Sequence, residues 1–325
     1  MEKKLDPAKN VSTKGMSFED WLTFRKGGIG GSDVPAILGI SRFKTPYDVW
    51  LDKTSPDTNR IDNPRMKAGR ILEDAIANWW AEDFQFQVRR DNKIRVHPTI
   101  PFLIGDIDRT IISPERGMGI LEAKNTTSWT YNQWKENGIS MEYYFQIQHY
   151  FSVMPQANWG AAAILVDGWM LQSIDLEPNR EVISELEEKL VSFWENHVVK
   201  MVPPEPINSE DIKKMFPVAS PLTSIVADDM VGAQVKDLMG VKAQIKTLEE
   251  AEGGLTVKIQ NYMRGYESLV DKDTTPIATW RQDKDGVFFD HKRFLAENKD
   301  ACEPYLSRRP GGRRFLLKGK LENNK

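Results

Sequence analysis

The sequence predicts a mixed α/β protein, and three stretches carry that prediction. Residues 102–124 hold two apolar runs on either side of a Ser-Pro-Glu-Arg-Gly turn, which is typical of a β-hairpin. Residues 64–84 place apolar side chains at helical spacing, so that they form one stripe. Residues 159–177 read as two further strands, and the first is apolar on both faces, as in the interior of a sheet. Predicted strands and an amphipathic helix therefore follow one another between residues 64 and 177, which favours a mixed α/β domain.

The bulk composition indicates a folded chain in a reducing compartment. With 325 residues, 40% of them apolar, the chain is long enough for one large domain or a domain with an appendage. A single cysteine excludes an intramolecular disulfide framework and four-cysteine metal sites, and the four histidines show no metal-ligand spacing. No apolar run approaches a membrane span, and no signal peptide is evident, so a cytoplasmic location is expected. The net charge of −3 leaves nucleic-acid binding to local basic clusters.

The N-terminal part combines a flexible arm at 1–15 with a glycine-rich loop. Ser17 begins a capping box and a short helix, and the loop then leads to a second helix that Ser32 or Asp33 would cap. Glycines before a helix expose backbone N–H groups, and Arg25 with Ser32 could complete a phosphate pocket. A plain glycine-rich connection fits the same text equally well. The loop consists of Gly27, Gly28, Gly30 and Gly31.

The next elements complete a core that we expect to run from residue 16 to 205. After a polar linker at 55–63 and the helix at 64–84, residues 88–96 read as a short, arginine-rich surface strand. The hairpin at 102–124 follows. Residues 141–154 and 179–199 have helical periodicity, and three prolines near 200–210 mark a boundary.

Residues 206–325 form a C-terminal segment of a different kind. Apolar side chains between 231 and 259 fall close to a heptad stripe, which predicts one long helix or, if Gly253-Gly254 turns the chain, a helical pair. Residues 277–282 and 313–318 read as short strands. Residues 307–320 are basic without an acid, so they could follow a phosphate backbone or remain a solvated tail.

The strongest chemical candidate lies in the hairpin. Glu122 and Lys124 are two residues apart, so an extended chain places both on one face, opposite Leu121 and Ala123. Acid–x–Lys triplets recur elsewhere in this chain, but this one follows an apolar run and pairs with a strand that carries Asp108. Two carboxylates on rigid strands can hold Mg²⁺ or Mn²⁺, and a nearby lysine can orient a water. The alternative is a structural ion pair.

Five short motifs in one order resemble the YqaJ-type viral recombinases, relatives of phage lambda exonuclease in the PD-(D/E)XK nuclease superfamily. The motifs are W-L-x-x-R-x-x-x-I-G-G-S-D, G-R-x-L-E, D-x-D-R, L-E-A-K and Y-F-Q-I-Q-H-Y, spread over residues 21–154. The resemblance implies a restriction-endonuclease-like core, with a central mixed sheet flanked by helices, and a C-terminal helical extension. It also implies Mg²⁺-dependent, 5′→3′ digestion of one strand of linear double-stranded DNA.

The resemblance assigns individual residues as well. It makes Asp108 and Glu122 metal ligands, Lys124 the catalytic lysine and Glu73 a helix-borne acid near the metal. Gln146 becomes the glutamine of the helix behind the lysine strand, and Arg25 and Ser32 line a pocket for the terminal 5′-phosphate. Such enzymes form closed rings, often trimers, around DNA ends and work beside a single-strand annealing recombinase. One departure is the Gly-Asp-Ile-Asp-Arg text, in which Asp106 competes with Asp108 as the ligand.

We therefore hypothesise a metal-dependent DNA exonuclease that makes 3′ single-stranded tails for phage-type recombination. An endonuclease or flap nuclease on the same fold is the first alternative, and a catalytically silent DNA-end-binding scaffold is the second. The intact set of Asp, Glu and Lys disfavours the scaffold, because burying three charges is costly without a function. A phosphotransferase is disfavoured because the glycine loop is not a P-loop.

Overall fold

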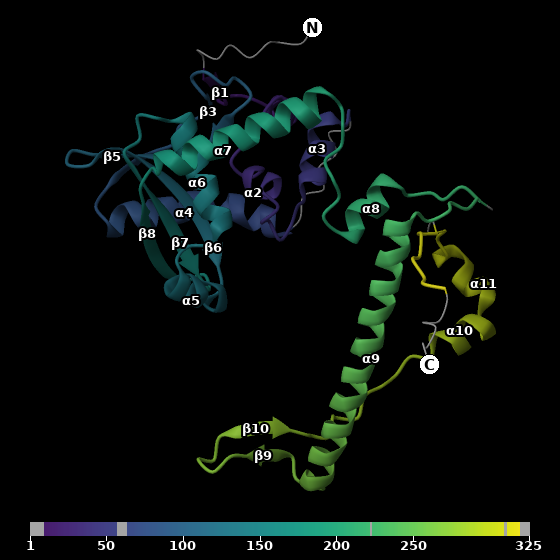
Figure 1. The fold of residues 1–325 in the computed structure, drawn as a ribbon. Helices are drawn as coiled ribbons and strands as arrows, with labels where there is room; N and C mark the ends of the chain where they lie inside the picture. The colour runs from purple at the N-terminus through teal and green to yellow at the C-terminus, as the bar shows by residue number, and fades with distance from the viewer. Residues whose placement is uncertain (1–9, 57–63, 222, 309–310, 319–325) are drawn as a thin grey trace. The chain divides into compact units, whose positions relative to one another are not determined.

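The computed structural model describes residues 10–56, 64–221, 223–308 and 311–318 (Figure 1). The chain divides into two compact units, Met1–Met215 and Phe216–Lys325. Most of the predicted arm at 1–15 and of the linker at 55–63 lies outside the described residues, as do Arg309 and Lys320 of the basic segment. Each unit is considered by itself below.

The first unit is built around a five-stranded mixed sheet with the order β2-β5-β6-β7-β8. Strands β6 and β7 run parallel, and every other neighbouring pair is antiparallel. The long β6 therefore joins the antiparallel β5 hairpin to the parallel β7, and it lies in the middle of the sheet. The bounds are β2 (Gln87–Arg89), β5 (Arg109–Ser113), β6 (Gly117–Thr126), β7 (Trp159–Val166) and β8 (Met170–Leu176).

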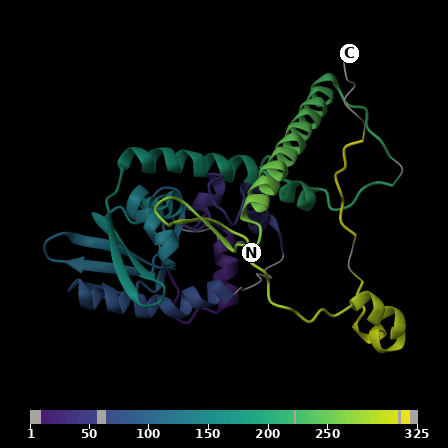
Figure 2. The same ribbon diagram turned by 90° about the horizontal axis from the view of Figure 1, so that it is seen from below.

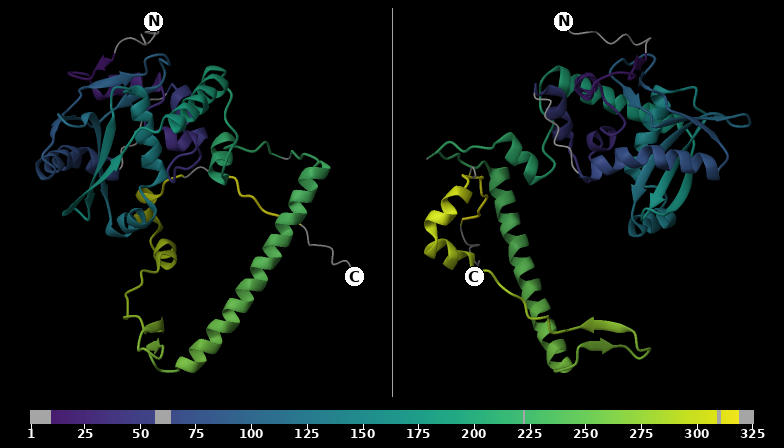
Figure 3. Two further views of the ribbon diagram at one scale, coloured as in Figure 1. Left: turned by 60° about the vertical axis from the view of Figure 1, so that its left-hand side comes forward. Right: turned by 180° about the vertical axis from the view of Figure 1, so that it is seen from behind.

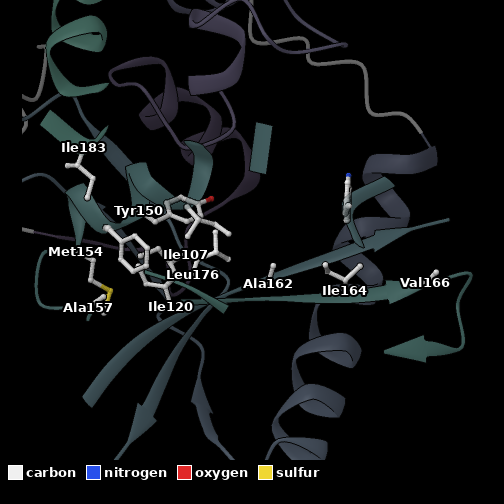
Figure 4. Close-up of a cluster of buried hydrophobic side chains, with 13 residues drawn as sticks. Ile107, Ile120, Tyr150, Met154, Ala157, Ala162, Ile164, Val166, Leu176 and Ile183 are labelled. Atoms are coloured by element: carbon white, nitrogen blue, oxygen red, sulfur yellow. The ribbon is translucent and has the colours of Figure 1, made fainter. Parts of the chain in front are cut away.

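Helices cover both faces of this sheet, as Figure 2 shows for α4 and α7. All eight residues of β7 are buried, and successive side chains enter different clusters. Ala161, Ala163 and Leu165 pack with α4 (Pro64–Asp83). Ala162, Ile164 and Val166 pack on the other side with α6 (Met141–Val153), in the cluster drawn in Figure 4. The predicted central mixed sheet flanked by helices is confirmed.

A small second sheet and several helices complete this unit. The small sheet is antiparallel with the order β1-β3-β4. Its strands are β1 (Val11–Ser12), β3 (Lys93–Val96) and β4 (Ile104–Asp106). The remaining helices are α1 (Phe18–Lys26), α2 (Val34–Ile37), α3 (Pro46–Thr54), α5 (Ser128–Asn137), α7 (Arg180–Phe193), a π-helical turn (Trp194–Val199) and α8 (Ser209–Met215).

Two predicted strands are each split between the two sheets. The run at 102–112 is interrupted at Ile107 and Asp108, so that β4 pairs with β3 while β5 pairs with β6. The run at 88–96 is likewise interrupted, with Asn92 in the left-handed region at φ 48°. Both predictions of one continuous strand are wrong, because each run leaves one sheet and enters the other. The alternation of apolar side chains in the sequence does not show where a run changes sheets. The arginine-rich strand is also less exposed than predicted, since Arg95 is buried against Asp91.

The helical predictions and the last strand pair are confirmed in this unit. Helices α4, α6 and α7 match the predicted ranges, and β7 and β8 match 159–177. Ser17 caps α1 by accepting a hydrogen bond from the backbone N–H of Asp20, which is one of the two hydrogen bonds of the predicted capping box. Asp33 is the N-cap residue of α2, one of the two residues predicted, but its side chain makes no capping hydrogen bond and α2 has only four residues.

The second unit consists mainly of one long helix and a hairpin, drawn from two directions in Figure 3. Helix α9 (Asp229–Met263) is continuous for 35 residues, so Gly253-Gly254 does not turn the chain and the helical pair is excluded. Strand β10 (Pro276–Thr279) overlaps the first half of the predicted strand at 277–282, but residues 313–318 form no strand. The further elements are β9 (Ser268–Val270), β10 (Pro276–Thr279), α10 (His291–Glu297), α11 (Lys299–Cys302) and a 3₁₀ turn (Glu303–Tyr305).

Burial differs sharply between the units. Among the described residues of the second unit, only Met263 and Cys302 are buried. In the part of the chain that the structure describes, no helix combines the length and the apolarity needed to cross a membrane.

Candidate active site

The middle of β6 presents the acid–x–Lys triplet to helix α6. Leu121 and Ala123 pack in the cluster on the α4 side, so Glu122 and Lys124 point to the opposite face. The Glu122 side chain is 3% exposed, and its Oε1 accepts hydrogen bonds from Lys124 Nζ at 2.5 Å and from Gln146 Nε2 at 2.6 Å. The predicted shared face of this triplet is confirmed.

Asp108 joins this pair from the break between β4 and β5. Its Oδ2 accepts a hydrogen bond from the backbone N–H of Ala123 at 2.8 Å, which fixes the carboxylate beside β6. The interruption that splits the predicted strand therefore positions Asp108. Asp108, Glu122, Lys124 and Gln146 are called the acidic centre below.

The charges of the acidic centre do not balance. Burial and the neighbouring Glu122 carboxylate raise the pKa of Asp108 well above its ordinary value. Burial likewise raises the pKa of Glu122, although Lys124 partly offsets this effect. Burial alone would lower the pKa of Lys124, but the Glu122 and Asp108 carboxylates reverse the effect and raise it. Two carboxylates thus share one permanently charged lysine.

The donor atoms of the acidic centre fit a hard divalent cation. Glu122 Oε2 is buried and has no hydrogen-bond partner among the described residues, although a buried carboxylate oxygen normally has one. Carboxylate oxygens are the ligands that Mg²⁺ and Mn²⁺ prefer, and a bound cation would relieve the raised pKa values of Asp108 and Glu122. The residues present therefore fit such an ion.

Glu73 does not join the acidic centre as a ligand in this structure. Its Oε1 accepts a hydrogen bond from Arg109 Nη1 at 2.8 Å, and Arg109 also contacts Asp74 and the Asp108 carbonyl. Glu73 is still close enough that its negative charge contributes to the raised pKa values of Asp108 and Glu122. In the described part of the chain, no group of three or more His, Cys, Asp or Glu residues is arranged to hold a metal. A direct ligand role for Glu73 would require Arg109 to release it.

The glycine loop forms a second centre. Arg25, near the end of α1, donates from Nη2 to the exposed Ser32 Oγ at 2.8 Å, so the predicted partners lie together. They line a cavity of about 140 Å³. We call this cavity the loop pocket; its lining residues are Trp21, Arg25, Gly30, Gly31, Ser32, Ile94, Ile104, Asp106 and Tyr150.

Two glycines are required by close approaches behind this pocket. A Cβ on Gly28 would lie 2.7 Å from the Phe102 carbonyl oxygen, where the loop bonds to the chain before β4. A Cβ on Gly31 would lie 2.5 Å from ring carbon Cε1 of Tyr150. Both distances are below any real Cβ contact, so the loop packs this closely only because these residues are glycines. A simple connection between two helices would not need glycine at these two positions, so the close packing favours a specific role for this loop.

A buried ion pair between Lys53 and Asp33, which the sequence analysis did not predict, lies next to the loop pocket. Lys53 on α3 donates to Asp33 Oδ2 at 2.8 Å and to the Arg25 carbonyl at 3.0 Å, and both charged side chains are fully buried. Asp33 also accepts from the Gly30 backbone N–H at 3.1 Å and lies 3.5 Å from the Arg25 guanidinium. Burial would raise the pKa of Asp33, but the cations of Lys53 and Arg25 hold it well below its ordinary value. The available signal was Lys53 lying four residues after the apolar Val49, on the same helix face.

Asp106 belongs to the loop pocket and not to the acidic centre. Its Oδ2 accepts a hydrogen bond from Trp21 Nε1 at 3.0 Å, and its side chain lines the cavity beside Arg25. Asp108, in contrast, lies against Ala123 of β6. The geometry therefore favours Asp108 over Asp106 as the partner of Glu122.

Gln146 joins the two centres. Its Nε2 donates both to Glu122 Oε1 at 2.6 Å and to the Tyr150 hydroxyl at 2.9 Å, and Tyr150 lines the loop pocket. Tyr150 lies one helical turn after Gln146, so sequence spacing could have found this contact. One side chain of α6 thus connects the acidic centre with a residue that lines the loop pocket.

Comparisons with known proteins agree with this arrangement of motifs. Residues 20–157 match the family described as the YqaJ-like viral recombinase domain. The chain is 29% identical over 258 residues to an uncharacterised protein, YqaJ, from Bacillus subtilis (strain 168), which covers 78% of this chain and 80% of that relative.

Two solved structures match this chain at low sequence identity. The alkaline exonuclease LHK-Exo from Laribacter hongkongensis matches with a TM-score of 0.48 and 18% identity, over 61% of this chain and 97% of that one. A phage-related exonuclease from Haemophilus somnus 129PT matches with a TM-score of 0.40 and 13% identity, over 54% of this chain and 96% of that one.

Proposed function

We propose that the protein is a DNA nuclease of phage-type recombination, because residues 20–157 match the YqaJ-like viral recombinase domain. More specifically, we propose a metal-dependent exonuclease that digests linear duplex DNA 5′→3′ and leaves 3′ single-stranded tails. The observation that supports this most is the Gln146 link between the acidic centre and the loop pocket. This link supports a site for bond cleavage in the acidic centre next to a site for a terminal phosphate in the loop pocket.

The acidic centre would perform the hydrolysis. Asp108 and Glu122 would hold Mg²⁺ or Mn²⁺, which supplies a Lewis acid and lowers the pKa of a bound water. Lys124 stays protonated, so it can orient the attacking water and stabilise the negative charge that develops on the phosphate. Gln146 fixes the orientation of Glu122 through its 2.6 Å hydrogen bond. Glu73 would assist near the metal after Arg109 releases it.

The loop pocket would hold the 5′-phosphate of the strand being degraded. Arg25 offers a guanidinium and Ser32 a hydroxyl, which together suit phosphate oxygens. A pocket for a terminal phosphate can be used repeatedly only if each cleavage leaves a new 5′-phosphate. Water would therefore attack the phosphorus, the P–O3′ bond would break, and the leaving 3′ oxygen would take up a proton. This regeneration couples end recognition to stepwise digestion.

The assembly and the partners are proposals of the same kind. Duplex DNA ends are the substrate, and a single-strand annealing recombinase would receive the 3′ tails. A closed ring, such as a trimer, would keep the enzyme on its DNA in the cytoplasm of a bacterial host.

Digestion of a linear duplex labelled at either the 5′ or the 3′ end tests this function. In Mg²⁺ the 5′ label should be lost first, EDTA should stop the loss, and a covalently closed circle should remain intact. Cutting of the closed circle would instead make the protein an endonuclease. Retained end binding without cleavage in either Mg²⁺ or Mn²⁺ would favour the silent scaffold.

A further inference from the structure

Helix α9 carries a sustained heptad pattern, and its apolar side chains stay exposed beside the described residues of its own unit. Numbering the heptad from Val231 as position a, eight of the ten a and d positions are apolar, as in coiled coils. We call these positions the α9 seam. Its apolar residues are Val231, Leu238, Val241, Ile245, Leu248, Leu255, Ile259 and Tyr262, and each is exposed by between 37% and 76%.

The rest of α9 is poorly suited to stand alone. Four glycines lie in the helix, and each weakens a helix relative to alanine. All four occupy outer b or c positions, away from the seam, and the ion pair of Lys246 with Glu250 lies on the same outer side. An isolated helix of this composition is marginal in water, because helix stability comes mainly from packing an apolar face. The glycines therefore favour a helix that is stabilised through its seam.

An apolar a/d stripe of this length is buried most completely by a second helix of similar length. At 1.5 Å per residue, the 35 residues of α9 extend about 52 Å. In the described part of the second unit, the other helices are short, with seven residues in α10 and four in α11. A second copy of α9 supplies both the length and the matching apolar pattern.

Charge complementarity decides the orientation. Antiparallel pairing about the centre of the seam places Lys242 beside Glu249 of the second copy, and Asp237 beside Lys258 of the second copy. By symmetry each pair occurs twice, so four flanking contacts are attractive. Parallel pairing in register would offer only Asp237 with Lys242 on the flanks. It would also bury Glu252, at an a position, against its own copy, whereas the antiparallel arrangement places Glu252 opposite Val241.

We propose that α9 forms an antiparallel two-stranded coiled coil with α9 of a second copy of this chain. The interface has two-fold symmetry, so it joins copies in pairs. Were the first units to form a ring, this contact would link two rings and double the mass of the assembly. The inference does not depend on the nuclease activity.

Sedimentation of the full-length chain tests the interface with a matched pair of variants. Leu248→Asp places a charge in the seam, and Val257→Asp places the same charge at an exposed outer f position. Leu248→Asp should halve the mass of the assembly or raise its dissociation constant at least about 10-fold. Val257→Asp should leave both unchanged. Equal behaviour of the two variants, or a wild-type chain whose mass Leu248→Asp does not change, would overturn the proposal and point to another cover for the seam.

Charge reversal tests the complementarity itself. Lys242→Glu alone should weaken the assembly by placing like charges beside each other, and so should Glu249→Lys alone. The double variant should restore association, because the attractive pair is rebuilt with its signs exchanged. Failure of the double variant to recover would contradict the antiparallel register.

Spin labels distinguish the two orientations directly. With Cys302 replaced by serine, a label at Lys236→Cys would lie roughly 30 Å along the axis from its copy in an antiparallel pair, and a label at Ala243→Cys roughly 10 Å. The distance at 236 should therefore exceed the distance at 243. Equal distances at the two positions would show a parallel pair and overturn the proposal.

Discussion

The acidic centre and the loop pocket both bury carboxylates beside a lysine, yet their electrostatics are opposite. In the acidic centre two carboxylates share Lys124, and the pKa values of Asp108 and Glu122 are raised. Next to the loop pocket, the cations of Lys53 and Arg25 both lie close to Asp33, and the pKa of Asp33 is lowered. Burial disfavours the charged carboxylate in both places, so the number of neighbouring cations decides the direction.

The difference indicates what each centre lacks. The acidic centre has an excess of negative charge and an unpartnered Glu122 oxygen, which suits a cation. In the loop pocket the Arg25 guanidinium lies next to the exposed hydroxyl of Ser32, and this pair of hydrogen-bond donors suits an anion. A metal ion and a terminal phosphate are complementary to these two sites. The predictions below test each half of this comparison.

The largest effect is expected from Lys124→Ala in the acidic centre. Loss of this cation should lower the single-turnover cleavage rate on the order of 10³-fold or more, because charge that develops on the phosphate is no longer stabilised. Binding of DNA ends, measured by fluorescence anisotropy in Ca²⁺, should be retained. Lys189→Ala is the matched control, since Glu187 and Lys189 form the same triplet on α7 and Lys189 is exposed. Cleavage at the wild-type rate would remove Lys124 from the mechanism.

Lys53→Met should destabilise the loop pocket by leaving Asp33 buried without its closest cation. We expect the free energy of unfolding to fall by about 3 kcal/mol, as for other broken buried ion pairs. Urea unfolding measures the loss, and Lys135→Met on the exposed side of α5 is the control. The double variant Asp33→Asn with Lys53→Met should recover part of the stability, because no unpaired charge remains. If the double variant is less stable than Lys53→Met, the electrostatic account of this pair is wrong.

Arg25→Ala should remove the discrimination between 5′-phosphorylated and 5′-hydroxyl ends. Loss of hydrogen bonds to a charged phosphate should reduce the preference by about 10-fold or more. The rate on 5′-hydroxyl DNA should change little, so the effect is confined to one substrate. Arg180→Ala, outside the residues that line the pocket, should keep the preference. An unchanged ratio in Arg25→Ala would place the phosphate site elsewhere.

The smallest effect is a pH dependence with opposite signs in the two centres. The lowered pKa of Asp33 means that the unfolded chain binds the proton more readily, so stability falls as the pH drops below about 4. The raised pKa values of Asp108 and Glu122 mean that the folded chain binds more protons above about pH 4, so in EDTA stability falls as the pH rises.

Two substitutions separate these slopes in thermal unfolding measured from pH 3 to pH 8. Asp33→Asn should reduce the loss of thermal stability at low pH. Glu122→Gln should reduce the loss of thermal stability as the pH rises. Addition of Mg²⁺ should have the same effect as Glu122→Gln in the wild-type chain and little effect in that variant. Identical profiles for the wild type and both variants would contradict the opposite charge balance.

Local sequence patterns predicted most of the helices and strands. In each centre they predicted one pair of residues, Glu122 with Lys124 and Arg25 with Ser32. Period-two alternation was enough to place Glu122 and Lys124 on one face, because a strand fixes the direction of every second side chain. Helical spacing predicted α4, α6 and α7 for the same reason. The break at Asp108 was not predictable, because it depends on β4 pairing with β3 in a separate sheet.

The sequence by itself determined the mixed α/β class, the heptad stripe and the residue types of the candidate site, since these follow from periodicity and motif order. Only the tertiary structure decided that Asp106 lies in the loop pocket while Asp108 meets Glu122. It also decided that Lys53 neutralises Asp33 and that Arg109 holds Glu73. The physical reason is that a buried charge is specified by its partners, and these partners come from elements far apart in the chain.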